Sequence, residues 1–139
     1  MKALKRILVF LTATVLLLSL VSCGDKSAAI KKEFEKDGWT VTTAKADDGA
    51  VKAVLSLILT EEQIEKAADY EIILCTKNYI KSAVIIKLPS ANDVKDFLTI
   101  EDKDGNKNTD IYDSAKENGT INGNCILITL DSDAKELFK

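Results

Sequence analysis

Residues 71–88, EIILCTKNYIKSAVIIKL, decide how the rest of the chain folds. Two runs rich in Ile, Leu and Val, 71–76 and 83–88, have the length and composition of β-strands. The segment 77–82 between them suits a hairpin loop. The stretch therefore predicts two neighbouring strands that the remaining elements must cover.

On the N-terminal side of this hairpin, residues 30–37 predict a short helix that stops at Gly38. Residues 39–43 alternate and are rich in Thr and Val, which predicts a strand headed by Trp39. The Asp-Asp-Gly sequence at 47–49 is typical of a turn.

The segment 50–59 admits two interpretations. A helix is favoured because four apolar residues recur at the spacing of one buried face, Val51, Val54, Leu55 and Ile58. A strand over 50–59, paired as a hairpin with 39–44, stays an alternative. The capping-box sequence at 60–63 then predicts a second helix that runs to about Asp69.

On the C-terminal side, Pro89 ends the second strand and Ser90 can cap a helix that runs to about Leu98. The remaining expected elements are a polar turn (101–110), a short helix before Asn-Gly (111–117), a last strand (125–130) and a terminal helix capped by Ser132 (133–138). The central order β-α-β-β-α-β is that of the ferredoxin-like split βαβ motif. We therefore predict a single α+β domain over 30–139, an antiparallel sheet with helices on one face, after an N-terminal helix.

Residues 1–22 have the parts of an export signal. Lys2, Lys5 and Arg6 are positive, and residues 7–18 are mostly apolar but too short for a comfortable membrane-spanning helix. The next residues, Leu20-Val21-Ser22-Cys23, resemble the lipobox of bacterial lipoproteins.

This resemblance implies cleavage between Ser22 and Cys23 and attachment of lipid, such as palmitate, to the Cys23 sulfur. Membrane anchoring through Cys23 at the extracytoplasmic face of the cell membrane would follow. Residues 23–29 would form a tether, of which the six residues after Cys23 reach roughly 20 Å at most. By layout, the part behind the tether resembles the small uncharacterised lipoproteins of AT-rich bacteria, a resemblance that implies no activity.

Charge and composition exclude several functions. Residues 23–139 hold 16 Lys and 22 Asp or Glu, a net charge of −6. An acidic domain without a basic run is unsuited to binding nucleic acid. The chain has no His, which excludes Ser/His/Asp and Cys/His nucleophile systems and removes the commonest metal ligand.

Residues 102–113, DKDGNKNTDIYD, resemble an EF-hand calcium loop. Oxygen-bearing side chains occupy five of the usual loop positions, Asp102, Asp104, Asn106, Asp110 and Asp113, and Asn108 would supply its backbone carbonyl. Lys107 stands where the loop requires Gly, Thr109 stands at an apolar position, and Asp113 is one methylene too short for good bidentate reach. A solvated turn is therefore expected, and no metal or cofactor site is assigned.

Cys75 and Cys125 lie among Ile and Leu in predicted strands, and we expect buried free thiols. A disulfide stays an alternative because export permits one, although the split βαβ places the two strands toward opposite edges. Trp39 is expected to be a core or rim aromatic, with an interface anchor as the alternative.

These observations favour a non-enzymatic binding or interaction module that docks a protein, peptide or small ligand. The alternative is an inhibitor or immunity-type lipoprotein against an envelope hydrolase, since a small acidic domain suits a basic target. An enzyme would need a deep pocket of acidic residues with perturbed protonation. The carboxylate pairs at 47–48 and 61–62 fit a turn and a helix start instead.

Overall fold

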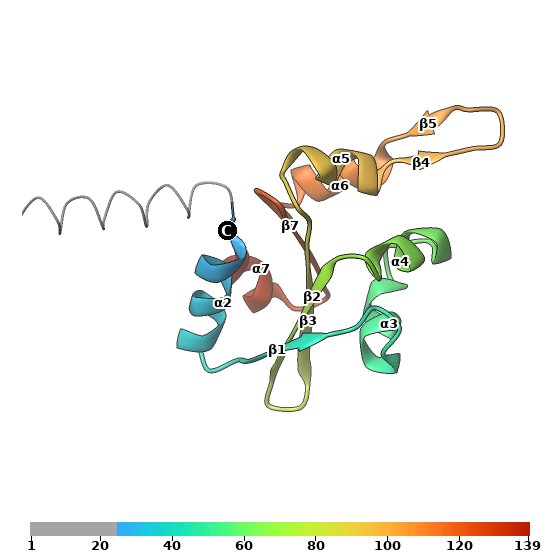
Figure 1. The fold of residues 1–139 in the computed structure, drawn as a ribbon. Helices are drawn as coiled ribbons and strands as arrows, with labels where there is room; N and C mark the ends of the chain where they lie inside the picture. The colour runs from blue at the N-terminus through green and yellow to red at the C-terminus, as the bar shows by residue number, and fades with distance from the viewer. Residues whose placement is uncertain (1–24) are drawn as a thin grey trace, which may run out of the picture.

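The computed structural model describes residues 25–139 (Figure 1). Leu20, Val21, Ser22 and Cys23, which carry the resemblance to a lipobox, lie outside the described residues. Within residues 25–139, no helix has both the length and the apolar character needed to cross a membrane.

The described part has the predicted α+β class, with helices packed on an antiparallel five-stranded sheet. The helices are α2 (Ser27–Lys36), α3 (Gly49–Leu55), α4 (Glu61–Ala67), α5 (Asn92–Leu98), α6 (Asp110–Glu117) and α7 (Ser132–Phe138). The strands of the sheet are β1 (Thr40–Ala44), β2 (Glu71–Lys77), β3 (Lys81–Lys87), β6 (Ile121–Asn122) and β7 (Cys125–Thr129). A separate hairpin consists of β4 (Ile100–Glu101) and β5 (Lys107–Asn108).

The hairpin predicted from residues 71–88 is confirmed and lies at the middle of the sheet. β2 and β3 pair antiparallel from Glu71↔Lys87 to Lys77↔Lys81. Residues 83–86 of β3 are completely buried, because β3 has strands on both sides and helices on both faces. A strand covered on both faces is apolar at successive positions rather than at every second one, as residues 83–86 are.

The strand order is β1-β2-β3-β7-β6, which corrects the ferredoxin-like split βαβ prediction. In that motif a helical crossover would make the first and second strands parallel and leave another strand between them. Here β1 is an edge strand that pairs antiparallel with β2. The physical reason is that α3 and α4 have seven residues each and are separated by a bend, so the chain re-enters the sheet where it left, at Ala44↔Ile72.

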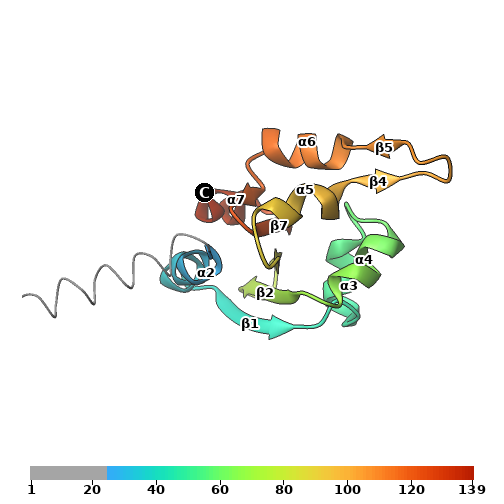
Figure 2. The ribbon, with the colours of Figure 1, turned by 45° about the horizontal axis from the view of Figure 1, so that its top comes forward.

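Helices cover both faces of the sheet, so the prediction of helices on one face was wrong (Figures 1 and 2). Alternate strand residues point to opposite faces and form two cores. One core lies under α3, α4, α5 and α6 and contains Ile72, Val84, Ile86, Ile126 and Ile128. The other lies under α2 and α7 and contains Ile73, Cys75, Ile85, Cys125 and Leu127.

Residues 50–55 are helical and a turn follows them, so the strand alternative for 50–59 was wrong. Val51 and Leu55 are fully buried as expected, but Ile58 is 47% exposed because α3 ends at Leu55. The capping box is confirmed. Thr60 Oγ1 accepts a hydrogen bond from the Gln63 backbone N–H (3.3 Å), and Gln63 Oε1 accepts one from the Thr60 N–H (3.0 Å).

The folded part begins before the predicted tether ends. α2 starts at Ser27, and the Ser27 N–H donates to Asp25 Oδ1 (2.9 Å). The Lys26 N–H donates to Oδ1 of Asn124 (3.1 Å), a buried residue next to β7. Residues 25–29 therefore belong to the domain, and the expected tether 23–29 is too long.

Candidate functional site

The calcium-loop resemblance of residues 102–113 falls on the β4–β5 hairpin and the first turn of α6. Asp102 closes the hairpin turn itself, because its carboxylate accepts hydrogen bonds from the backbone N–H groups of Asp104 (2.9 Å) and Asn106 (2.8 Å). The Asn106 side-chain amide donates to it as well (3.0 Å). The bonds from Asn106 hold the pKa of Asp102 below its usual range. Within residues 25–139, no group of three or more His, Cys, Asp or Glu residues is placed to hold a metal ion.

A groove of about 850 Å³ lies between α4, α5 and the β4–β5 hairpin. Its charged lining residues are of both signs: Glu62, Lys66, Lys95, Asp96, Glu101, Asp102 and Lys107. A general acid at neutral pH needs a raised carboxyl pKa, whereas that of Asp102 is lowered. The groove therefore presents charges of both signs, and Asp102 is unsuited to act in it as a general acid.

Cys75 and Cys125 are free and completely buried. Their strands, β2 and β7, flank β3 rather than lying toward opposite edges of the sheet as predicted. The two strands are roughly 10 Å apart, and Cys75 and Cys125 lie opposite residues of β3 that are four positions apart, Ala83 and Lys87, so a disulfide cannot join them. Burial raises the pKa of both thiols to about 12, so neither is a nucleophile in the folded protein.

Trp39 is a core aromatic, as expected, and the interface alternative for it was wrong. It is 3% exposed, and its ring packs edge-on against Phe34 with the centroids 5.2 Å apart and the planes at 77°. Its Nε1–H donates to Asp37 Oδ2 (3.2 Å). The contact between Trp39 and Phe34 fixes the direction in which the chain runs from α2 into β1.

Exposed apolar side chains gather on one surface, which we call the apolar face. Among residues 25–139 the large exposed hydrophobics are Leu57, Ile58, Tyr79, Ile80 and Leu130. Leu57, Ile80 and Leu130 line a cavity of about 410 Å³, and Ile58 and Thr129 line another of about 300 Å³. The two cavities adjoin, because Leu57 precedes Ile58 and Thr129 precedes Leu130 in the chain.

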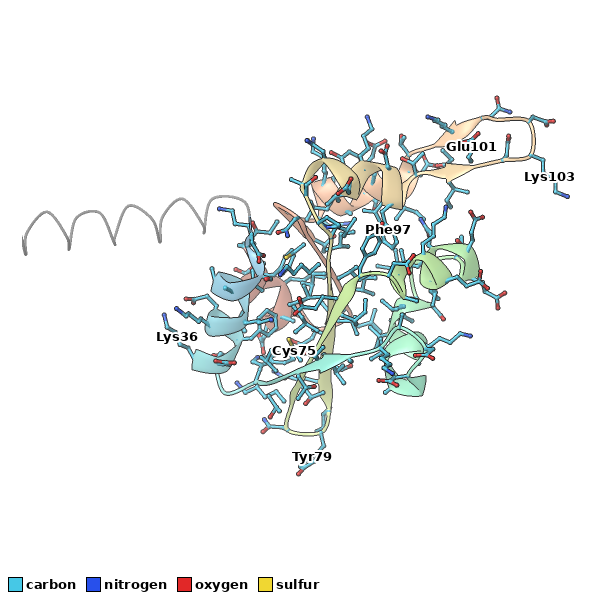
Figure 3. All side chains as sticks on the ribbon, viewed as in Figure 1. Lys36, Cys75, Tyr79, Phe97, Glu101 and Lys103 are labelled. Carbon is cyan, nitrogen blue, oxygen red and sulfur yellow. The ribbon has the colours of Figure 1, made fainter. Side chains whose placement is uncertain are left out.

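Tyr79 lies at the tip of the β2–β3 hairpin, where its side chain projects into solvent (Figure 3). Asn78 and Tyr79 have φ values of +55° and +59°, and the Ile80 N–H donates to the Lys77 carbonyl (3.3 Å), as in a tight hairpin turn. A positive φ on a bulky residue is strained, by about 1 kcal/mol or more. Tyr79 is also fully exposed, so no intramolecular packing offsets the strain.

Ion pairs hold the base of this hairpin to the helices on both sides. Lys77 Nζ lies 3.1 Å from Asp37 Oδ2 beside α2, and Lys81 pairs with Asp133 of α7. Like charges at the facing positions Lys77 and Lys81 are thereby compensated. The tip of the hairpin therefore projects from a base that these two ion pairs hold in place.

The apolar hairpin tip and the N-terminal end of the described chain lie at opposite ends of β3 (Figure 1). β3 runs from Lys81, beside the tip, to Lys87, whose Nζ lies 2.9 Å from Asp25 Oδ2. Its seven residues span roughly 20 Å.

The sequence pattern of residues 77–82 predicts a hairpin loop but not the apolar face. The signal that the sequence carries is Tyr79 after Asn78 in a tight turn, where Asn-Gly is usual. Comparison with protein-family models, curated proteins and solved structures found no match to this chain.

Proposed function

We propose that this chain is a lipid-anchored, extracytoplasmic binding module that docks a partner protein through its apolar face. Its anchor would be lipid on Cys23, and its role would be non-enzymatic. The observation that carries this proposal is that the exposed side chains of Leu57, Ile80 and Leu130 line one cavity, with the exposed Ile58 and Tyr79 next to them in the chain.

Docking would bury side chains that now face water. Full burial of one large apolar side chain contributes about 1.5–3 kcal/mol, and an aromatic residue at the centre of an interface is a common anchor. Tyr79 combines full exposure with strained backbone, so its presence lowers the stability of the free domain. Strained, exposed residues of this kind concentrate at functional sites.

The anchor and the apolar face are compatible in space. Cys23 is two residues before Asp25, which is paired with Lys87 at one end of β3. Lipid on Cys23 would keep that end beside the bilayer, so the hairpin tip would face away from it by roughly 20 Å or more. The tip would then meet a protein outside the membrane rather than the lipid.

Photo-crosslinking in intact cells tests the docking. A photoreactive phenylalanine analogue replaces Tyr79, and a matched control replaces Lys103, which is exposed at the end of the β4–β5 hairpin (Figure 3). We expect discrete protein adducts from position 79 that disappear with Leu130→Asp, and none from position 103. Adducts from both positions, or from neither, would contradict docking through the apolar face.

A separate measurement tests the anchor. The wild type is expected to take up labelled fatty acid and to sediment with membranes, whereas Cys23→Ala does neither. If Cys23→Ala stays membrane-bound and the wild type takes up no label, the lipoprotein assignment is wrong, irrespective of the crosslinking result.

The exposed hairpin tip also suits the second candidate, an inhibitor that inserts Tyr79 into the cleft of an envelope hydrolase. The two roles differ in their readout. An inhibitor lowers the rate of a purified peptidoglycan hydrolase in proportion to its concentration, and Tyr79→Gly relieves this. A docking module leaves every such hydrolase unaffected.

A further inference from the structure

The outer edge of β7 is paired over only part of its length. β6 pairs with Cys125 and Ile126, and the Leu127 N–H donates to the Thr120 carbonyl (2.9 Å). Backbone groups of alternate residues point to the same edge of a strand, so the N–H and C=O of Thr129 also point away from β3. These two groups have no backbone partner among residues 25–139, although Thr129 is only 6% exposed.

A groove of about 300 Å³ runs along this open edge. One wall is α6, which contributes Ile111, Ser114 and Ala115, and the other side is bounded by Lys135 of α7. The small side chains of Ser114 and Ala115 leave room for another backbone between helix and strand. The exposed Ile58 of the apolar face lines the same groove.

We propose that an extended segment of the partner protein adds to this edge as a β-strand beside residues 128–129, where it pairs with Thr129. This rests on the proposed function and specifies its docking mode. The N–H and C=O of Thr129 point outward side by side, and another extended backbone supplies the complementary C=O and N–H. Such a strand would continue the line of β6 and would satisfy the unpaired backbone groups of Thr129.

The two walls define the side chains that the added strand carries. Ile128 belongs to the core under α6, and Thr129 points to the other face of the sheet, so partner residues opposite them point to different sides. The residue opposite Ile128 meets Ile58, Ile111 and Ala115, which favours an apolar side chain. The residue opposite Thr129 lies on the side of Lys135, which forms no ion pair within residues 25–139 and favours an acidic side chain.

The probe is a synthetic peptide with this pattern, acetyl-Thr-Glu-Ile-Glu-Thr-amide, added to the full chain in detergent micelles. Exchange of the Thr129 amide hydrogen is followed by NMR. With a Kd of about 1 mM, a short unconstrained peptide at about 5 mM slows this exchange roughly sixfold. The charge-reversed peptide with Lys in place of Glu is expected to have a smaller effect.

Ser114→Trp fills the groove from an exposed position of α6, and Glu117→Trp is the matched control, exposed on the same helix but outside the groove. Ser114→Trp is expected to abolish the protection of Thr129, and Glu117→Trp to preserve it. No protection by about 5 mM peptide, or protection that Ser114→Trp leaves intact, overturns strand addition.

Failure of this inference is distinguishable from failure of the proposed function. If the peptide has no effect while Tyr79 still yields adducts, the apolar face docks a partner without an added strand. If the peptide protects Thr129 but Tyr79 yields no adducts, the edge binds extended segments and the apolar face is not the docking surface.

Discussion

The carboxylate of Asp25 lies 2.9 Å from the ammonium nitrogen of Lys87, and this pair joins the start of the described chain to the end of β3. The other carboxylate oxygen of Asp25 accepts the Ser27 N–H at the start of α2. Burial by itself would raise the pKa of Asp25, but the hydrogen bonds from Lys87 and Ser27 outweigh it and hold the pKa well below its usual range. The N-terminal segment is therefore attached most firmly when Asp25 is ionised.

Asp25→Asn removes this charge and keeps an acceptor for the Ser27 N–H. We expect the free energy of unfolding at neutral pH to fall by about 0.5–1 kcal/mol, the value of a partly exposed ion pair. Because the pKa is lowered in the folded state, the contribution is full above the ordinary value of 3.8 and is lost as the pH falls through the folded-state pKa. Urea unfolding across this range measures it, and a difference between wild type and variant that is independent of pH would contradict it.

Tyr79→Gly is expected to stabilise the domain. Glycine adopts the φ of +59° without strain, although it also gains freedom in the unfolded chain, so the net gain is about 0.5–1 kcal/mol. Ile80→Gly is the matched control, because Ile80 is exposed without a positive φ and its replacement should be neutral or destabilising. Thermal unfolding compares the two variants. Destabilisation by Tyr79→Gly would mean that the ring packs within the domain, against the proposed docking role.

The central hairpin could be predicted because residues 83–86 are all apolar, without alternation. A strand has this pattern when both of its faces are buried. That same observation argued against helices on one face, and the ferredoxin-like assignment overlooked it. Strand order depends on where a connection re-enters the sheet. The pattern of residues 50–69 indicates helices but not their bend at residues 56–60, and that bend returns the chain antiparallel beside β1.

The apolar face could not be predicted because exposure is a tertiary property. Ile58 fits the helical repeat of Val51 and Leu55, but α3 ends before it, and only then does it face solvent. Leu130 continues the apolar run of β7 and is exposed because β7 ends one residue earlier. By contrast, burial of Cys75 and Cys125 followed from their Ile and Leu neighbours alone.

Cys75 and Cys125 should be unreactive in the folded protein and reactive once it unfolds. Their pKa of about 12, against an ordinary 9.0, lowers the thiolate fraction about a thousandfold, and burial also blocks access of the reagent. In a Cys23→Ala background, alkylation without reductant is expected to label no thiol in buffer and two in denaturant. No labelling in denaturant would indicate a disulfide, and rapid labelling in buffer would place a thiol at the surface.

Asn124 is expected to be the polar residue whose loss most loosens the N-terminal segment. It is 1% exposed, its Nδ2–H donates to the Leu88 carbonyl (2.9 Å), and its Oδ1 accepts the Lys26 N–H. Asn124→Ala removes both bonds and leaves a buried carbonyl with one partner fewer, which costs about 2–3 kcal/mol. Asn118→Ala is the control, because Asn118 is exposed and bonds only to Ser114, so its replacement should change stability by less than about 0.5 kcal/mol.

The same variant separates the attachment of residues 25–29 from the stability of the sheet. Amide exchange of Lys26 should quicken in Asn124→Ala by more than exchange of the β3 amides does, because only Lys26 loses its acceptor directly. Equal acceleration throughout would show that Asn124 stabilises the fold as a whole. Selective acceleration at Lys26 would show that Asn124 attaches the N-terminal segment locally, beside the ion pair of Asp25. These two attachments would keep the domain close to the proposed lipid anchor, with the apolar face directed outward.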